Sequence, residues 1–323
     1  MSSVRVEVTG PFHLEATVRT LQRRPTDRLD HLVDGAYLRL HRTREGLVLA
    51  RVENRGSLDE PDLRLSFVHG RPSAALRREL AATTRRLLGL DVDPSPIEER
   101  LRRTAGLRDL ATALRGMRPP CFATLLEGFG RTVPYQQLSL DAGSSLTARM
   151  MERFGESVEH EGRRYFAFPA AARLAAAAED DFRALGFSRS KGRTLIGVAE
   201  ALASGELDPD ELESLPTPEA WQRLLALRGV GPWTASLLLL RGMGRLDAFP
   251  ASDVGVNRGI ATLLGEDPKT FHADRFAAPF GPQRGMIYFY SLGAQLLGKG
   301  LITPAGDPAL RRGAEGPDRH SSL

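Results

Sequence analysis

Cysteine is almost absent from the sequence, because Cys121 is the only one among 323 residues. A single thiol excludes an internal disulfide, a cysteine-based zinc site and an iron–sulfur cluster. Long apolar runs are missing as well, since stretches such as residues 235–240 fall far short of the roughly 20 residues of a membrane span. The N-terminus, MSSVRVEVTG, lacks the apolar core of a secretory signal. We therefore expect a cytoplasmic protein with no membrane partner.

Lysine is also scarce, since the 44 basic residues comprise 41 arginines and three lysines. The formal net charge is +4 and the pI about 9.5. GC-rich codon usage explains the arginine excess, although arginine binds phosphate well and a mild positive charge is compatible with a nucleic-acid partner. The seven histidines are scattered, and the sequence contains neither HExxH nor GxxxxGK[ST]. We expect no catalytic metal and no cofactor.

Two patterns divide the chain. Residues 1–91 predict an α+β domain with strands over 4–8, 36–42, 47–53 and 63–69 and helices over 13–23 and 73–89. A linker containing Pro94 and Pro96 follows. Residues 92–302 consist of many short helical segments with short turns, which is typical of an all-α domain. Residues 303–323 are polar and rich in glycine and proline, and predict a disordered tail.

The stretch LRGVGPWTASLLLLRG (227–242) predicts two helices joined by a very tight turn. Gly229 ends the first helix and Pro232 begins the second, which gives a helix–hairpin–helix. Without side chains at Gly229 and Gly231, backbone N–H groups can approach a phosphate, and the positive end of the second helix adds to the attraction. Thr234 can contribute a hydroxyl to the same anion. Such a contact would not depend on DNA sequence, although similar hairpins also serve packing alone.

Four segments together resemble the helix–hairpin–helix DNA glycosylase superfamily. LRGVGPWTA is similar to the family hairpin LPGVG-x-x-TA, with Arg228 replacing the usual proline. LDAFPASDVGVNRGI places Asp253 where the family has its catalytic aspartate. Two further segments resemble the family's QQ-x-S and LG-x-S-x-x-K regions: FGRTVPYQQLSLDAGSSLTARMMERFG and ALGFSRSKGRTLIGVAEAL. The order of domains resembles the bacterial 3-methyladenine DNA glycosylase II group, which implies a TATA-binding-protein-like N-terminal fold.

The resemblance implies chemistry for Asp253 and Trp233. Cleavage of a C1′–N bond develops positive charge on the sugar, which a carboxylate at Asp253 would stabilise; an aspartate at a helix start can also be a simple N-cap. Trp233 occupies the position where strand-cutting relatives carry a nucleophilic lysine, which implies hydrolysis without lyase activity. Its ring suits stacking and cation–π contact with a cationic alkylated purine, or alternatively packs the hairpin.

Other roles also follow only from the resemblance. Gln137 falls at the position that fills the gap left by a flipped base, with Gln136 and Tyr135 beside it, although polar residues on a helix are ordinarily solvated surface. The backbone carbonyls of three residues would hold a structural monovalent cation: Leu225, Leu227 and Val230. The family's further pocket aromatics are replaced by Leu237, Val254 and Gln283, for which Tyr135, Tyr288 and Phe289 could compensate.

The sequence thus predicts a monomeric, monofunctional DNA glycosylase of base excision repair. Its partner would be double-stranded DNA containing a damaged base, and its substrates alkylated purines of the 3-methyladenine and 7-methylguanine type. Two alternatives remain open at this point. One is a weakly active or non-catalytic helix–hairpin–helix DNA-binding protein, and the other is a glycosylase for deaminated or etheno bases.

Overall fold

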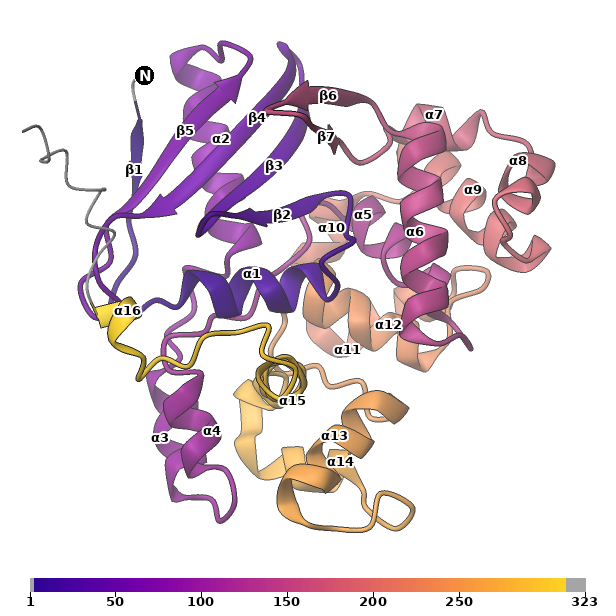
Figure 1. Ribbon diagram of the computed structural model, residues 1–323. Coiled ribbons are helices and arrows are strands. Elements are labelled where there is room, and N and C mark those ends of the chain that lie inside the picture. The colour runs from indigo at the N-terminus through magenta and orange to yellow at the C-terminus, as the bar shows by residue number, and fades with distance from the viewer. Residues whose placement is uncertain (1–2, 312–323) are drawn as a thin grey trace, which may run out of the picture.

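The computed structural model describes residues 3–311. The N-terminal part of the chain contains one antiparallel sheet. The sheet has five strands in the order β1-β5-β4-β3-β2 (Figure 1). Its elements are β1 (Val4–Val6), α1 (Leu14–Gln22), β2 (Asp30–Val33), β3 (Ala36–Thr43), β4 (Gly46–Asn54), β5 (Leu63–His69) and α2 (Ala74–Leu87). The predicted α+β class of this part is confirmed.

Two periodicities explain how this part closes over a core. Leu63 and Leu65 alternate along β5 and point to the same face of the sheet, as expected for a half-buried strand. Leu14, Val18 and Leu21 recur at helical spacing along α1 and enter the same hydrophobic cluster. The helix and the sheet therefore bury their apolar faces against each other.

Strand β2 is absent from the sequence-based prediction. It pairs with β3 through a turn at Asp34 and Gly35, whose φ angles are +48° and +74°. Two consecutive residues in the left-handed region are characteristic of a type I′ turn, for which Asp-Gly is a preferred sequence. The DHLVDGAYLRL stretch therefore carried the signal of a hairpin.

The remainder is predominantly helical, as predicted. Its helices are α3 (Ser95–Arg103), α4 (Arg108–Ala113), α5 (Leu125–Gly130), η1 (Val133–Tyr135), α6 (Leu140–Phe154), α7 (Ala171–Ala175), α8 (Glu179–Ala184), α9 (Arg189–Ser204), α10 (Pro209–Ser214), α11 (Thr217–Leu225), α12 (Pro232–Leu237), η2 (Leu238–Gly242), α13 (Val254–Leu264), α14 (Ala273–Ala277), η3 (Ala278–Gln283), α15 (Met286–Leu297) and α16 (Pro308–Arg311). No helix within residues 3–311 is long and apolar enough to cross a bilayer.

One hairpin interrupts this helical part and departs from the all-α expectation. Strands β6 (Ser157–His160) and β7 (Arg163–Phe166) pair in antiparallel fashion. Glu161 and Gly162 form the turn with φ angles of +49° and +72°. This is again a two-residue turn with both φ angles positive, flanked by alternating residues.

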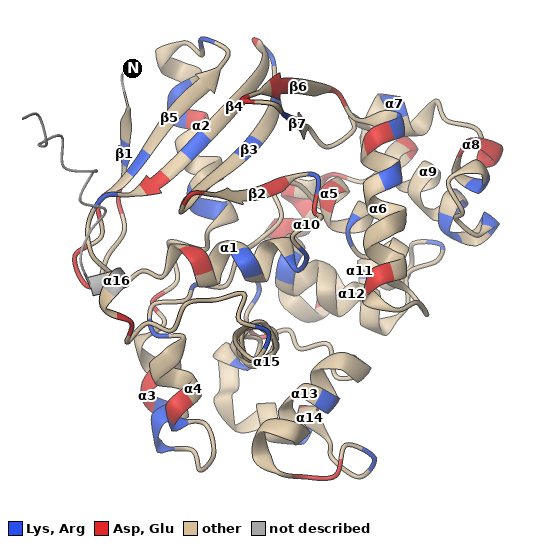
Figure 2. Cartoon of the chain, viewed as in Figure 1, with Lys and Arg blue, Asp and Glu red and all other residues tan. Residues whose placement is uncertain are grey.

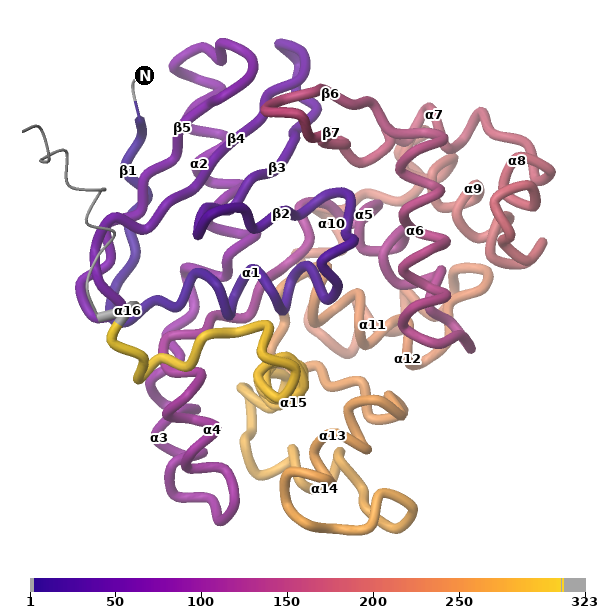
Figure 3. The backbone as a smooth tube through the Cα atoms, viewed as in Figure 1, coloured from indigo at the N-terminus to yellow at the C-terminus, as the bar shows by residue number. Residues whose placement is uncertain are grey.

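Two segments for which the sequence predicts irregular chain, the linker and the tail, contain ordered structure. Helix α3 begins at Ser95 with proline in its first turn, where proline is tolerated, so the irregular linker ends before it. After α15 the chain runs back beneath α1 toward the sheet (Figure 3). There the Thr303 N–H donates to Glu15 and the Ala305 N–H to the carbonyl of Ala113. Residues 303–311 of the expected tail are thus anchored by hydrogen bonds, and residues 312–323 lie outside the described part.

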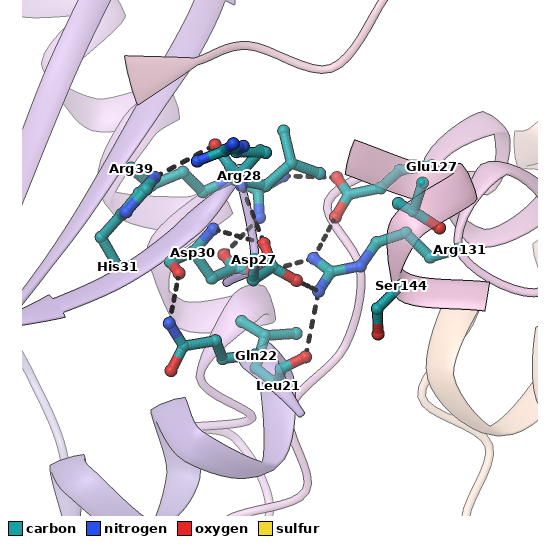
Figure 4. A network of polar contacts seen from close by, with 12 residues as sticks. Leu21, Gln22, Asp27, Arg28, Asp30, His31, Arg39, Glu127, Arg131 and Ser144 are labelled. Carbon is teal, nitrogen blue, oxygen red and sulfur yellow. Dashed lines mark hydrogen bonds and ion pairs between the residues drawn. The ribbon is translucent and has the colours of Figure 1, made fainter. Parts of the chain in front are cut away.

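A buried network of charges joins the two parts of the chain (Figure 4). Arg39 on β3 contacts Asp30 at 2.6 Å and also pairs with Glu127 on α5. Arg131 lies 2.6 Å from Asp27 and 3.2 Å from Glu127, and it pairs with Asp30 as well. Burial disfavours the charge on Asp30, but Arg39 and Arg131 outweigh it and hold the pKa of Asp30 well below its usual range. Each charge of this network therefore has a partner of opposite sign.

The same junction fixes the C-terminal end of α1. Arg131 donates to the Leu21 carbonyl at 3.1 Å, and Arg241 donates to the carbonyls of Thr20 and Leu21 at 3.0 and 3.3 Å. The last carbonyls of a helix have no hydrogen-bond donors within the helix, and here the two buried guanidiniums donate to them. Side chains of the helical part thereby hold the segment that follows α1.

Candidate active site

The hairpin forms one wall of an open cleft of about 840 Å³. The other walls come from the segment before α6, the start of α9 and the start of α13. The lining residues are Tyr135, Gln136, Gln137, Leu138, Ser188, Ser190, Lys191, Gly229, Gly231, Pro232, Trp233, Thr234, Ser252, Asp253, Val254 and Gly255. The cleft thus brings together the hairpin, the QQ-x-S segment and the aspartate that the sequence singled out separately.

The turn between α11 and α12 requires one of its glycines for geometry. Gly229 has φ of +79°, and a Cβ there would lie 2.0 Å from Thr194 Oγ1 on α9. Gly231 has φ of −100°, and a Cβ built on it meets no atom within 4 Å. Among the described residues, the backbone N–H groups of Gly231, Trp233 and Thr234 have no acceptor. These donors cluster at the start of α12, where a helix attracts an anion.

The Thr234 hydroxyl does not take the expected position toward an anion. Thr234 is only 2% exposed, and its Oγ1 accepts a hydrogen bond from Gln136 Nε2 at 2.9 Å. Gln136 also donates to the Gly229 carbonyl at 2.9 Å. Gln136 therefore links the QQ-x-S segment to the hairpin, and the Thr234 hydroxyl is held by Gln136 as an acceptor.

Asp253 and Trp233 meet across the floor of the cleft. Trp233 Nε1 donates to Asp253 Oδ2 at 3.0 Å. The other oxygen, Oδ1, accepts the N–H of Val256 at 2.9 Å, which makes Asp253 the N-cap of α13. The N-cap and the site interpretations are therefore both compatible with this geometry, and two donors fix the carboxylate.

A second, smaller hollow of about 230 Å³ adjoins the first. Tyr135, Leu138, Trp233, Asp253 and Gly255 line both hollows. The remaining lining residues of the smaller one are Thr20, Arg23, Arg24, Leu140, Val256, Tyr288, Leu292, Gln295, Leu296 and Lys299. Its walls come from the end of α1, from α13 and from α15, so the N-terminal part contributes directly to the site.

The aromatic residues that could compensate for missing ones are now placed. Tyr135 and Tyr288 line the smaller hollow, whereas Phe289 is fully buried and lines neither hollow. Of the positions where the family carries further aromatics, Val254 lines the cleft and is 70% exposed. Leu237 is buried in the core. Tyr135, Tyr288 and Trp233 are therefore the aromatic residues that line the smaller hollow.

Gln137 is placed as an exposed tip of the cleft. Its φ of +54° lies in the left-handed region, which is uncommon for a residue other than glycine. The next residue, Leu138, is an exposed large apolar side chain at 45% and lines both hollows. Sequence reasoning selected the polar Gln137 and missed Leu138, although an apolar residue in a polar loop is a recognisable signal.

The three backbone carbonyls named for a monovalent cation fit such an ion in part. The Leu227 carbonyl accepts the Val230 N–H at 3.1 Å and retains a second lone pair. Within the described residues, the carbonyls of Leu225 and Val230 accept no hydrogen bond. Neutral carbonyl oxygens suit a hard cation, which would add positive charge beside the hairpin donors.

Two protein-family models match this chain, and together they include most of the residues that line the two hollows. Residues 131–275 match the HhH-GPD superfamily of base excision DNA repair proteins, and residues 3–123 match the AlkA N-terminal domain. The chain carries an HhH-GPD domain behind an AlkA N-terminal domain. The HhH-GPD match contains the hairpin, Gln136, Gln137 and Asp253. The other match contains α1, whose last turn leads into the smaller hollow.

Individual relatives agree with this assignment. The chain is 32% identical over 193 residues to a DNA-3-methyladenine glycosylase of Bacillus subtilis, a match that covers 60% of this chain and 64% of the relative. Across the curated relatives that head the comparison, the matched part is about half to two thirds of their length. The HhH-GPD domain and the sheet domain thus correspond to part of those proteins.

Solved structures show the same fold. A 3-methyladenine DNA glycosylase from Archaeoglobus fulgidus superposes with a TM-score of 0.74 at 24% identity, covering 90% of this chain and 97% of that one. An 8-oxoguanine glycosylase/lyase of Clostridium acetobutylicum in complex with double-stranded DNA gives 0.68 at 19% identity, covering 93% and 99%. The order of sheet domain and helical HhH-GPD domain is therefore confirmed as the fold of this chain.

Proposed function

We propose that this chain is a DNA glycosylase of base excision repair that hydrolyses the N-glycosidic bond of alkylated purines in double-stranded DNA. The observation that carries the proposal is the contact between Trp233 and Asp253 at the border of two hollows. It sets a carboxylate beside an aromatic face, within reach of a hairpin whose N–H donors are free. The names of the relatives above support alkylated bases as the substrate class.

DNA contact would begin at the hairpin. The free N–H groups of Gly231, Trp233 and Thr234 suit one phosphate of the backbone. Basic and acidic residues are interspersed along helices such as α3, α6 and α8 (Figure 2), so these helices present mixed charge. The local donors of the hairpin therefore carry the phosphate contact. A base turned out of the duplex would enter the smaller hollow, while Gln137 and Leu138 at its edge would fill the vacated space.

The bond cleavage follows from the carboxylate. The C1′–N bond breaks with both electrons moving to the base, and the sugar acquires oxocarbenium character. Asp253, held by Trp233 and by the Val256 N–H, stabilises that charge. Water then adds to C1′ and loses a proton to solvent. A base that is positively charged leaves as a neutral molecule, so it needs little help from an acid.

Lack of lyase activity forms part of the proposal. Trp233 stands where a Schiff-base lysine would be needed in the hairpin, and an indole cannot form one. Two lysines line the hollows elsewhere, Lys191 and Lys299. Lys191 Nζ donates to the Pro134 carbonyl at 3.0 Å, and partial burial lowers its pKa. Borohydride trapping on damaged duplex should give no covalent adduct. If wild type formed an adduct and Lys191→Ala did not, Lys191 would act as a Schiff-base nucleophile, and the proposed hydrolysis without lyase activity would be wrong.

The decisive experiment compares wild type with Asp253→Asn. Duplexes that contain 3-methyladenine, 7-methylguanine, hypoxanthine, ethenoadenine or uracil are incubated with protein, and abasic sites are cleaved with alkali. We expect release of methylated bases by wild type and its loss in Asp253→Asn, with DNA affinity retained. Asparagine is an equally good N-cap, so α13 should keep its start. Equal release by both proteins would contradict the role of Asp253, and binding without release by either would favour a non-catalytic DNA-binding protein.

A further inference from the structure

Arg23 is one of three cationic residues that line the smaller hollow, together with Arg24 and Lys299, and its positive charge conflicts with a cationic substrate. It follows α1, has φ of +62°, and donates to the Tyr288 hydroxyl. Its guanidinium carbon also lies 5.4 Å from the centre of the Tyr135 ring. Its Nε is buried and has no partner, and within residues 3–311 no carboxylate lies within 4.0 Å of its guanidinium. Arg23 thus brings an unpaired positive charge to the hollow that it lines.

The surroundings of Arg23 do not cancel this charge. The neighbouring Arg24 is paired with Asp141 at 2.7 Å, whereas Lys299 adds a further cation to the lining. Behind Tyr288 lies the fully buried Arg241, whose Nε and Nη1 have no partner. Burial, with a contribution from Arg23, lowers the pKa of Arg241 to about 10, so Arg241 remains charged at neutral pH. Two uncompensated guanidiniums therefore contact the same tyrosine.

Positive charge at this place distinguishes two kinds of leaving base. When the C1′–N bond of a cationic methylated purine breaks, the two electrons neutralise the base, and nearby positive charge gives no help. When the bond of an uncharged purine breaks, the same two electrons leave the base as an anion, which must be stabilised until solvent water protonates it. A guanidinium donating to the acceptor edge of the base, such as O6 and N7, provides that stabilisation.

We propose that Arg23 is a base-contacting residue that extends the reaction to uncharged purines with an acceptor edge, by binding the departing anion. The proposal rests on the glycosylase function given above and adds a residue of the N-terminal part to it. Residues of the helical part fix the backbone that leads to Arg23. Arg131 and Arg241 donate hydrogen bonds to the carbonyls of Thr20 and Leu21, near the end of α1.

The test compares Arg23→Gln with wild type on two duplexes, one with hypoxanthine and one with 7-methylguanine, under single-turnover conditions. Removal of one donor at a developing negative charge typically costs on the order of 100-fold in rate. We expect hypoxanthine release to fall at least about tenfold, and 7-methylguanine release to stay unchanged or rise. Arg23→Lys should retain part of the hypoxanthine rate, because it keeps the charge but loses the planar fork.

Arg24→Gln is the matched control, since Arg24 lines the same hollow but is paired with Asp141. It should leave the ratio of the two rates unchanged. Thermal unfolding and DNA affinity of Arg23→Gln report whether the variant is folded.

The possible results separate the two claims. An equal fall on both bases in Arg23→Gln, or a wild type that releases 7-methylguanine but no hypoxanthine, would overturn the role of Arg23 and leave the proposed function standing. A wild type that releases neither base would overturn the proposed function and this role with it.

Discussion

The two glycines of the hairpin should respond differently to the same substitution. For Gly229→Ala, adopting φ of +79° costs about 1–2 kcal/mol, because Cβ crowds the carbonyl in the left-handed region. The new Cβ would also lie 2.0 Å from Thr194 Oγ1, which donates to the Ser190 carbonyl at 3.0 Å. Displacing that buried hydroxyl adds about 0.5–1.5 kcal/mol. We expect Gly229→Ala to lower the free energy of unfolding by about 2–3 kcal/mol.

Gly231→Ala should leave the fold unchanged. Alanine readily adopts φ of −100° and ψ of 177°, and its methyl group meets no atom within 4 Å. The unfolded chain loses some entropy, so stability should stay equal or rise by up to about 1 kcal/mol. The methyl group would, however, stand beside the free N–H donors at the start of α12, and we expect DNA affinity to fall by about tenfold, or ~1.4 kcal/mol.

Urea unfolding and fluorescence anisotropy on two duplexes of unrelated sequence measure both effects. The loss of affinity in Gly231→Ala should be the same on both duplexes, because the backbone donors contact phosphate and not bases. It should also leave the salt dependence of binding nearly unchanged, since no cationic side chain is removed. Wild-type affinity in Gly231→Ala would refute the phosphate role of the hairpin. Wild-type stability in Gly229→Ala would refute the geometry of the turn.

Three other changes test the junction and the site. Arg131→Met leaves Asp27 without its buried counter-charge, and it leaves Asp30 and Glu127 with Arg39 alone. The substitution should cost about 3–5 kcal/mol in urea unfolding, and a loss below about 1 kcal/mol would contradict the network. His13 is buried with Nδ1 accepting the Ala16 N–H, and burial lowers its pKa, so stability should decline as pH falls below about 6.5. His13→Asn should make the free energy of unfolding fall less steeply between about pH 7.5 and 5.5. Trp233→Phe removes the side-chain donor to the Asp253 carboxylate. On the proposed function it should slow base release about tenfold or more with DNA affinity retained, as single-turnover rates would show; an unchanged rate would mean that this hydrogen bond does not position the carboxylate.

The elements that sequence could predict are those with a local signal. The sequence predicts the hairpin because Gly229, Gly231 and Pro232 define it within four residues. Strands β2, β6 and β7 were missed although their turns, Asp34-Gly35 and Glu161-Gly162, contain the glycine that a two-residue turn with positive φ favours. These strands are short and partly polar, so their periodicity is weak, and only the turn chemistry distinguishes them from loop or helix.

The parts of the site that sequence could not predict depend on contacts between distant residues. Arg23 and Tyr288 are 265 positions apart and meet only after the sheet domain docks on the helical part. The sequence predicts that the Thr234 hydroxyl faces an anion. In the structure this hydroxyl accepts a hydrogen bond from Gln136, which lies 98 positions earlier in the chain. Neither partner has a distinctive local pattern. A residue's type indicates which chemistry its side chain can perform. Whether that side chain is free to contact a ligand depends on which distant residues pack against it or form hydrogen bonds with it.

The junction explains why the sheet domain matters for the site although it lacks the hairpin. Buried ion pairs contribute little net stability over an apolar core, yet losing one partner is costly, so the network strongly favours one arrangement of the two parts. In that arrangement Arg131 reaches both Asp30 and the Leu21 carbonyl, which couples the docking of the sheet to the end of α1. The residue two positions on is Arg23. Docking of the N-terminal part therefore places the charge of Arg23 at the smaller hollow, whereas the helical part positions the Asp253 carboxylate. On the proposed function, substitutions around α1 should change which bases are accepted and leave Asp253 in place, so base selection and bond cleavage can change independently.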